Sequence, residues 1–191
     1  MRRMICLLLA LLPAFLTGCQ SARRIETASV IENVSVQRRG GALCYTFYLL
    51  SDSEKPDSVT VCAPSFEQAR TLAERSYIPH MTLAKLELLL IEEEVRQDVM
   101  KGDIDYIATQ ASFSPQAHIA LCDEKTLRRL QREAAAQSLI ERQIDLLREE
   151  HPQVKSDCLS VFNSYARGES FEVPLITCDR ELRVSLVRNA P

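Results

Sequence analysis

A pair of glycines, Gly40-Gly41, separates two stretches in which apolar and polar residues alternate. The valines between residues 28 and 37 fall on one side of an extended chain, and every second residue from 43 to 49 is apolar or aromatic. A period of two is typical of a strand with one buried face, and glycine tolerates the positive φ angles of a tight hairpin turn. The pattern therefore predicts that an antiparallel hairpin opens the folded part of the chain.

Strand and helix patterns follow one another along the rest of the chain. Strand patterns cover residues 59–63, 81–91, 117–122 and 171–187, and helical patterns cover residues 65–74, 92–107, 124–150 and 157–166. Ser65 begins the first helix, because Gln68 completes a capping box three residues later. A second capping box, Ser138 with Glu141, predicts that the longest pattern forms two helices, or one helix bent near Ala136. We expect an α+β fold, in which a mixed sheet begins with the antiparallel hairpin and is packed with several helices.

The first residues have the pattern of a secretory signal. The chain begins Met1-Arg2-Arg3, and an apolar run of thirteen residues follows from residue 4 to residue 16. This run is too short to span a bilayer core of about 30 Å, which takes roughly 20 helical residues. It ends at Leu16-Thr17-Gly18-Cys19, which resembles the lipobox of bacterial lipoproteins. At a lipobox a signal peptidase cuts before the cysteine, and diacylglycerol is attached to the cysteine sulfur.

The lipobox divides the chain into three parts. We expect residues 1–18 to be a signal peptide, residues 19–27 to be a lipidated tether that begins at Cys19, and residues 28–191 to be the folded α/β domain. Each buried CH₂ of an acyl chain contributes about 0.8 kcal/mol, so two or three chains hold a protein firmly on the outer face of a membrane. The alternative is an ordinary signal peptide, in which Cys19 has no role.

The charge balance limits the partners of the mature chain. Cleavage leaves 173 residues with 21 basic and 26 acidic side chains, and therefore a net charge of −5. A nucleic-acid-binding protein needs a basic face to neutralise phosphates, so we expect no nucleic acid partner. The same charge balance argues against electrostatic binding to the membrane through a basic patch. The lipid on Cys19 is therefore the expected anchor.

Five cysteines remain besides Cys19. They are Cys44, Cys62, Cys122, Cys158 and Cys178. No CxxC motif occurs, so a zinc or redox motif has no support. Cys44, Cys62 and Cys122 lie within apolar, strand-like runs, and we expect them to be buried, inert thiols rather than disulfide partners or catalytic groups.

The remaining titratable residues suggest no catalytic or metal site. His80, His118 and His151 are scattered, and a dyad of His118 with Cys122 is a weaker interpretation than two ordinary strand residues. Asp103 and Asp105 alternate around an isoleucine, but no calcium-loop spacing follows, so solvated carboxylates are expected. The charged helical pattern at 124–150 is expected to be a solvated face rather than an interaction surface. We therefore predict no catalytic residue, no cofactor and no metal, and only Cys19 as a functional site.

Several segments line up in order with one known family. They are Arg23-Arg24-Ile25-Glu26 after the cysteine, the hairpin through Leu50, the helix Ser65 to Glu74, the strand with an acidic helix start Leu86 to Val95, the strand and helix Ala117 to Leu130, and the segment Val173-Pro174-Leu175-Ile176. In this order the pattern resembles the Ger(x)C family, the lipoprotein C subunits of spore germinant receptors. It departs from the family at Gln20 and Ser21, and at Lys85 and Glu87. Family members usually continue into a further domain, so we expect an N-terminal-domain-only relative.

The resemblance implies a non-enzymatic subunit on the outer face of the spore's inner membrane. Such a subunit associates with a multi-span subunit and a second integral-membrane subunit (the A and B types) and supports nutrient-triggered germination. Two rival hypotheses stay open. One is a general surface lipoprotein that binds a small ligand or an envelope partner. The other is an exported enzyme that uses one of the free cysteines.

Overall fold

The computed structural model describes residues 28–50, 57–110, 112–133, 135–152, 154, 156–178 and 182–189. The expected signal peptide, the lipid attachment at Cys19 and the expected tether lie outside the described residues. The sheet begins at Ser29, directly after the expected tether.

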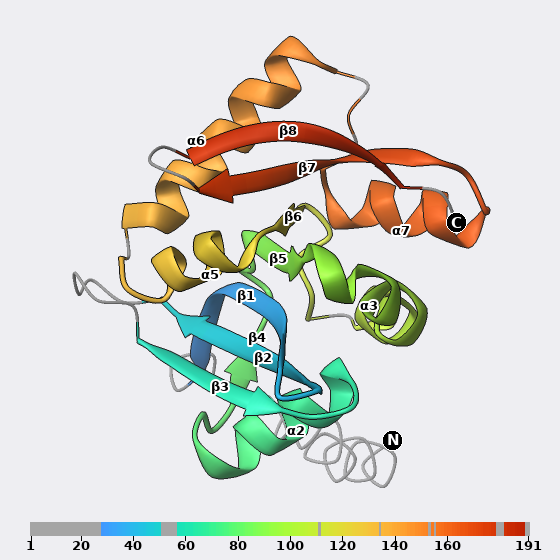
Figure 1. Cartoon of the computed structure of the whole chain (residues 1–191). Coiled ribbons are helices and arrows are strands. Elements are labelled where there is room, and N and C mark those ends of the chain that lie inside the picture. Colours follow the sequence, from blue (N-terminus) through green and yellow to red (C-terminus); the bar gives the residue numbers. More distant parts are fainter. Residues whose placement is uncertain are drawn as a thin grey trace, which may run out of the picture.

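The described residues contain one eight-stranded sheet in the order β3-β2-β1-β5-β6-β7-β8, with the short β4 also paired to β1 (Figure 1). The strands are β1 (Ser29–Arg39), β2 (Ala42–Leu49), β3 (Ser58–Cys62), β4 (Met81–Thr82), β5 (Leu88–Glu92), β6 (His118–Cys122), β7 (Phe171–Cys178) and β8 (Leu182–Asn189). The central strands β1, β5, β6 and β7 are parallel, whereas β2, β3 and β8 pair antiparallel with their neighbours. The expected α+β class with a mixed sheet and an opening hairpin is confirmed.

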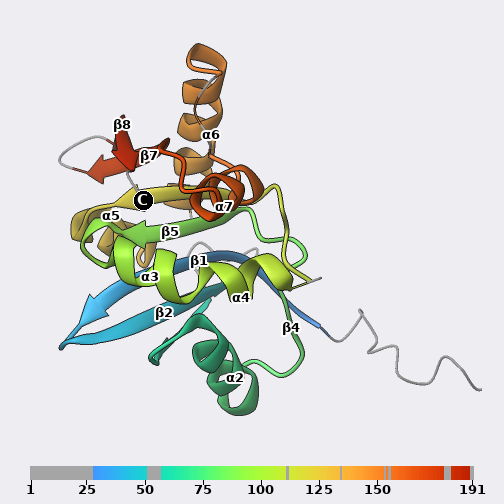
Figure 2. The same cartoon turned by 90° about the vertical axis from the view of Figure 1, so that its right-hand side faces the viewer.

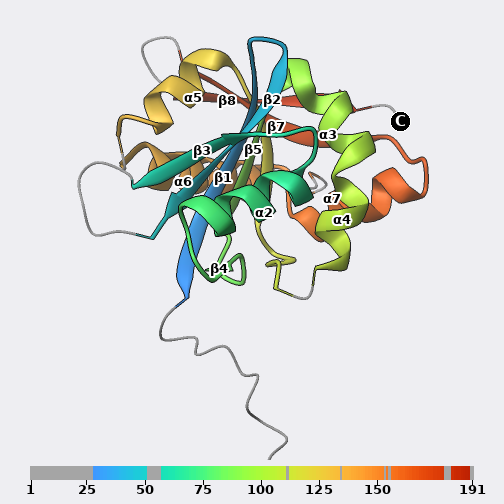
Figure 3. The ribbon, with the colours of Figure 1, turned by 90° about the horizontal axis from the view of Figure 1, so that it is seen from below.

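Helices cover both faces of this sheet. They are α2 (Phe66–Ser76), the 3₁₀ turn η3 (Glu93–Val95), α3 (Arg96–Gly102), α4 (Ile104–Thr109), α5 (Glu124–Leu130), α6 (Ala135–Glu150) and α7 (Cys158–Ala166). Buried residues of α2, α3, α4 and α7 join one core, and those of α5 and α6 join the other. Figure 3 shows α2 and α4 in front of the strands, and Figure 2 shows α6 extending beyond the sheet.

Alternation along the strands assigns each side chain to one of the two cores. On β5, Leu89 and Ile91 pack with α2, α3 and α4, whereas Leu88 and Leu90 pack with α5 and α6. A strand that is buried on both faces is apolar at nearly every position, which explains the uninterrupted apolar run from 88 to 91. The turn between β1 and β2 has φ angles of 57° at Gly40 and 86° at Gly41, which confirms the hairpin.

Two strand predictions differ from the structure. Residues 81–91 do not form one strand, because the chain turns after Leu83, whose carbonyl oxygen accepts a hydrogen bond from the Leu86 N–H at 3.0 Å. Both leucines are buried although they are three residues apart, so a period of two fails at this turn. The extended segment predicted near the C-terminus is a hairpin, in which β8 pairs antiparallel with β7 over eight residue pairs.

Two helix predictions also differ. The pattern predicted as one helix over 92–107 is divided into η3, α3 and α4, and the second division falls at Asp103. The pattern at 124–150 forms two helices, as one of our two interpretations predicts, but the Ser138 capping box is wrong because Ser138 lies inside α6. Asp123 caps α5 instead, and its side chain accepts the Thr126 N–H.

The prediction that Asp103 is a solvated carboxylate is wrong. Asp103 is 2% exposed, and its two oxygens accept the Tyr45 hydroxyl at 2.7 Å and the Phe66 N–H at 2.8 Å. Phe66 is the first residue of α2, so the carboxylate also lies at the positive end of that helix dipole. Burial raises the pKa of Asp103, and the two hydrogen bonds act in the opposite direction. Asp105, by contrast, is exposed as expected.

Replacement of Asp103 tests this assignment. Asp103→Ala leaves the Tyr45 hydroxyl and the Phe66 N–H buried without an acceptor, and each such loss costs about 1–3 kcal/mol. We therefore expect the free energy of unfolding, measured by urea denaturation, to fall by roughly 2–6 kcal/mol. Asp105→Ala is the matched control and should change it by less than about 0.5 kcal/mol. Equal effects of the two substitutions would contradict the assignment.

Candidate functional site

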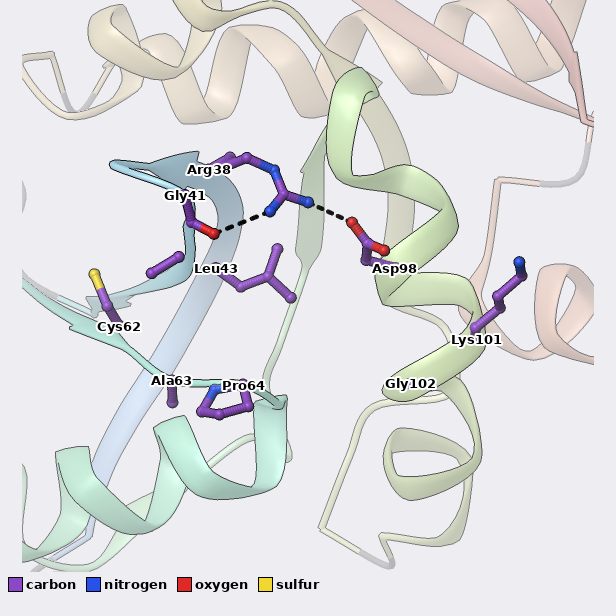
Figure 4. Close-up of a pocket in the computed structure, with 10 residues that line it drawn as sticks. Arg38, Gly41, Leu43, Cys62, Ala63, Pro64, Asp98, Lys101 and Gly102 are labelled. Atoms are coloured by element: carbon purple, nitrogen blue, oxygen red, sulfur yellow. Dashed lines mark hydrogen bonds and ion pairs between the residues drawn. The ribbon is translucent and has the colours of Figure 1, made fainter.

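A broad depression lies between the β1–β2 hairpin and α3. It has a volume of about 650 Å³ and is open to solvent. Its walls are Arg38, Gly41, Ala42, Leu43, Cys62, Ala63, Pro64, Asp98, Lys101 and Gly102 (Figure 4). We refer to it as the hairpin depression. The β1–β2 hairpin that lines it lies at the end of β1 opposite to the start of that strand (Figure 3).

Arg38 connects the hairpin to the rest of this site. Its backbone N–H donates to the carboxylate of Glu92 at 2.8 Å, and Glu92 is buried at the end of β5. Its guanidinium donates to the Gly41 carbonyl oxygen at 3.1 Å and forms an ion pair with Asp98 on α3. Figure 4 shows the guanidinium spanning the space between the hairpin and α3, whereas the Lys101 ammonium is directed away from the hairpin.

The geometry of the hairpin depression suits contact with a protein surface. Ligand pockets usually bury most of a small molecule, and an open depression does not. The charges of Arg38 and Asp98 compensate each other, and the floor is formed by small apolar side chains such as Leu43 and Pro64. Such a surface provides apolar side chains for packing and polar groups at its edge for hydrogen bonds with a partner protein. Its lining offers no activated nucleophile and no general base beside one.

The prediction that Cys44 and Cys62 are inert thiols is wrong. The two residues are directly opposed in the β2–β3 register, and their sulfur atoms form a disulfide. Cys62 is exposed, and only Cys44 is buried. Alternation in the sequence placed each cysteine in a strand, but the pairing depends on the register between the strands. The disulfide fastens the edge strand β3 to β2 beside the hairpin depression.

The other described cysteines are buried thiols. Cys122, Cys158 and Cys178 are free and buried, and the expectation for Cys122 is confirmed. Burial raises the pKa of Cys122 well above its usual value, and burial also raises the pKa of Cys158. A nucleophilic cysteine needs a lowered pKa, because the thiolate is the reactive form. Both shifts therefore favour the unreactive thiol.

His118 contacts neither Cys122 nor an exposed nucleophile. The two residues begin and end β6, roughly 13 Å apart at 3.3 Å per residue. Instead, His118 Nε2 lies 3.4 Å from the Asp145 carboxylate, and His118 Nδ1 lies 3.5 Å from Ser156 Oγ. No sequence motif predicts this Ser–His–Asp arrangement, because its members come from three separate segments. Ser156 is completely buried, so a substrate cannot approach its oxygen. Burial lowers the pKa of His118.

Three carboxylates, from Glu32, Glu87 and Glu141, lie close together where α6 covers the sheet, and no sequence motif predicts this group. The backbone places Glu32, Glu87 and His118 side by side, because the Glu87 N–H donates to the Glu32 carbonyl oxygen and the His118 N–H to the Glu87 carbonyl oxygen. Glu141 on α6 forms a side-chain hydrogen bond with Glu87. Burial, and then the charge of Glu87, raises the pKa of Glu141 to about 8. Glu141 therefore carries a proton at neutral pH.

The described residues hold no group of three or more His, Cys, Asp or Glu side chains placed to bind a metal ion. Among the described helices, none is both long and apolar enough to cross a bilayer. Comparisons with models of protein families, with curated proteins and with solved structures found no match to this chain.

The raised pKa of Glu141 predicts a pH dependence of stability. Between pH 4.5 and about 8 the folded state binds a proton on Glu141 that the unfolded state has released. The free energy of unfolding should therefore fall as the pH rises through this interval. Glu141→Gln should flatten the decrease and should make the protein more stable than the unsubstituted chain above pH 8. Urea denaturation at a series of pH values measures both effects.

The exposed Glu150, at the end of the same helix, supplies the control. Glu150→Gln should leave the pH dependence of the unsubstituted chain in place. If Glu141→Gln also leaves it in place, Glu141 is not the group that causes the pH dependence.

Proposed function

We propose that this chain is a non-enzymatic lipoprotein subunit of a spore germinant receptor. A lipid on Cys19 anchors it to the outer face of the spore's inner membrane, and it supports nutrient-triggered germination through contacts with multi-span receptor subunits of the A and B types. It acts as a scaffold or relay between proteins.

The observation that carries the proposal is the direct continuity between the lipobox and the fold. Nine residues, 19–27, separate the expected cleavage point from the described chain, and β1 begins at Ser29. The elements that follow agree with the order implied by the Ger(x)C resemblance. They are the opening hairpin, α2, the buried strand β5 leading into an acidic turn, β6 with α5, and β7 with its proline.

The disulfide gives independent support for an exported protein. Disulfides form and persist in oxidising compartments outside the cytoplasm and are rare within it. Cys44 and Cys62 form such a bond, and Cys62 is exposed, so reductants in the surrounding solution have access to it. A cytoplasmic chain would keep this pair reduced, so the pairing agrees with the signal peptide and the lipobox.

The hairpin depression supports a role in protein contacts. It is open, it combines small apolar side chains with a compensated ion pair, and it lies at the end of the sheet away from the tether. The domain of a membrane subunit that projects from the bilayer can reach such a surface. Arg38 is its central residue, because it contacts the hairpin, β5 and α3 together.

A second candidate function is the binding of a small ligand by a surface lipoprotein. The observation that favours it is a more enclosed depression of about 250 Å³ between α4 and α7. Its apolar lining includes Ile104, Phe113 and Phe162, and Gln110 and Asn163 supply amide groups at its wall. An apolar pocket with a few polar groups is the usual form of a small-molecule site.

The chemical state of the mature chain provides a first test. We expect the protein purified from its native membrane to begin at Cys19 with acyl groups attached, and to contain the Cys44–Cys62 disulfide. Mass spectrometry of proteolytic peptides, with and without reduction, measures both modifications. An unprocessed N-terminus would contradict the anchor, and fully reduced Cys44 and Cys62 would contradict the oxidising location.

Co-purification tests the receptor assignment. The chain with a C-terminal tag is recovered from dormant-spore inner membranes in mild detergent, and the proteins bound to it are identified. We expect multi-span receptor subunits to be recovered with the unsubstituted chain and with Asp105→Ala as the surface control. Arg38→Ala should reduce their recovery, because it removes the contacts at the hairpin depression. Recovery of no receptor subunit with the unsubstituted chain would contradict the proposal.

A further inference from the structure

We propose that the domain rests on the bilayer surface at the end where β1 begins, with Leu50 and Tyr77 inserted among the lipid head groups. The inference rests on the lipid anchor proposed above and adds an orientation to it. The occupant of this surface is the membrane that carries the anchor.

Two backbone hydrogen bonds bring these side chains to the start of β1. The Leu50 N–H donates to the Val30 carbonyl oxygen at 3.0 Å on one side of the strand. The Ser29 N–H donates to the His80 carbonyl oxygen at 3.1 Å on the other side, and Tyr77 precedes His80 by three residues at the end of α2. Figure 3 shows the first residues of β1 beside β4 and the end of α2 at one extremity of the molecule.

Leu50 and Tyr77 are both exposed to solvent although their side chains are largely apolar. Tyr77 is 66% exposed, the largest value among the large apolar side chains that the structure describes, and Leu50 is 54% exposed. Apolar surface in water is unfavourable. Tyrosine combines an apolar ring with a polar hydroxyl and is enriched at the interface between membrane and water. Contact with lipid at the start of β1 is therefore favourable for both side chains.

The length of the tether brings this end of the domain to the membrane. Nine residues precede Ala28 from Cys19 onward, and a residue spans at most about 3.6 Å, so the start of β1 lies within roughly 30 Å of the lipidated sulfur. The hairpin lies at the far end of the 11-residue β1, roughly 35 Å further away.

This orientation explains how the hairpin depression stays accessible. With Leu50 and Tyr77 against the bilayer, β1 leads away from the membrane, and Gly40-Gly41 lies at the distal end. A partner domain above the membrane then meets the surface around Arg38, while the opposite end of the sheet is occupied by lipid.

Single tryptophan reporters test the orientation, because the sequence contains no tryptophan. Leu50→Trp and Tyr77→Trp place the reporter at the proposed contact. Ala42→Trp and Lys101→Trp, at exposed positions of the hairpin depression, are the controls. Each lipidated full-length variant is incorporated into phosphatidylcholine vesicles with brominated acyl chains, which quench tryptophan fluorescence at short range. We expect severalfold stronger quenching at positions 50 and 77 than at positions 42 and 101.

Equal quenching at all four positions, with the protein still on the vesicles, overturns the orientation and leaves the anchor intact. The acyl groups on the N-terminal peptide are measured separately by mass spectrometry. A chain without them contradicts both the anchor and the orientation. Hydrogen exchange of the unsubstituted lipidated chain gives the same test without any substitution. Exchange at residues 77–80 should slow on vesicles, and unchanged exchange there contradicts the contact.

Discussion

Two hydrogen bonds to the buried carboxylate of Asp103 join parts of the chain that are far apart in sequence. Tyr45 comes from the opening hairpin, Phe66 begins α2, and Asp103 separates α3 from α4. A buried carboxylate is tolerated only where donors satisfy it, so these elements have one acceptable arrangement. The Phe66 ring then packs edge-on against Tyr45 and Phe47 and closes the larger core. The wall of the hairpin depression formed by α3 is placed by this arrangement.

The two faces of the sheet are stabilised differently. The face that packs with α2, α3, α4 and α7 carries the larger apolar core, beside which the Asp103 carboxylate is buried. On the other face, β1 contributes buried polar residues, and Ser35 Oγ lies 3.2 Å from the Tyr48 hydroxyl. Helix α6 packs on this face with Glu141 beside Glu87, and burial raises the pKa of Glu141 to about 8. A helix that covers polar groups depends on solution conditions more than a helix that covers an apolar core, because its contacts include titratable pairs.

The proposed function needs a rigid body at a fixed distance from a membrane and a surface for partners. The parallel centre of the sheet supplies the rigid body, and the disulfide fastens its antiparallel edge. The start of β1 and the hairpin depression lie at opposite ends of one strand, so the tether and the proposed contact surface do not compete for space. Fold alone does not define function, and the assignment depends on the lipobox and the ordered resemblance.

The sequence by itself determined the fold class, the opening hairpin at Gly40-Gly41 and the existence of most helices and strands, and it predicts a lipobox at Cys19. These follow from local periodicity, glycine conformation and short motifs, which act within a few residues. Only the tertiary structure decided the pairing of Cys44 with Cys62, the burial of Asp103 and the raised pKa of Glu141 beside Glu87. Each depends on sheet register or on helix docking, because its partners are between 18 and 58 residues apart. Local pattern carries no information about contacts at that separation.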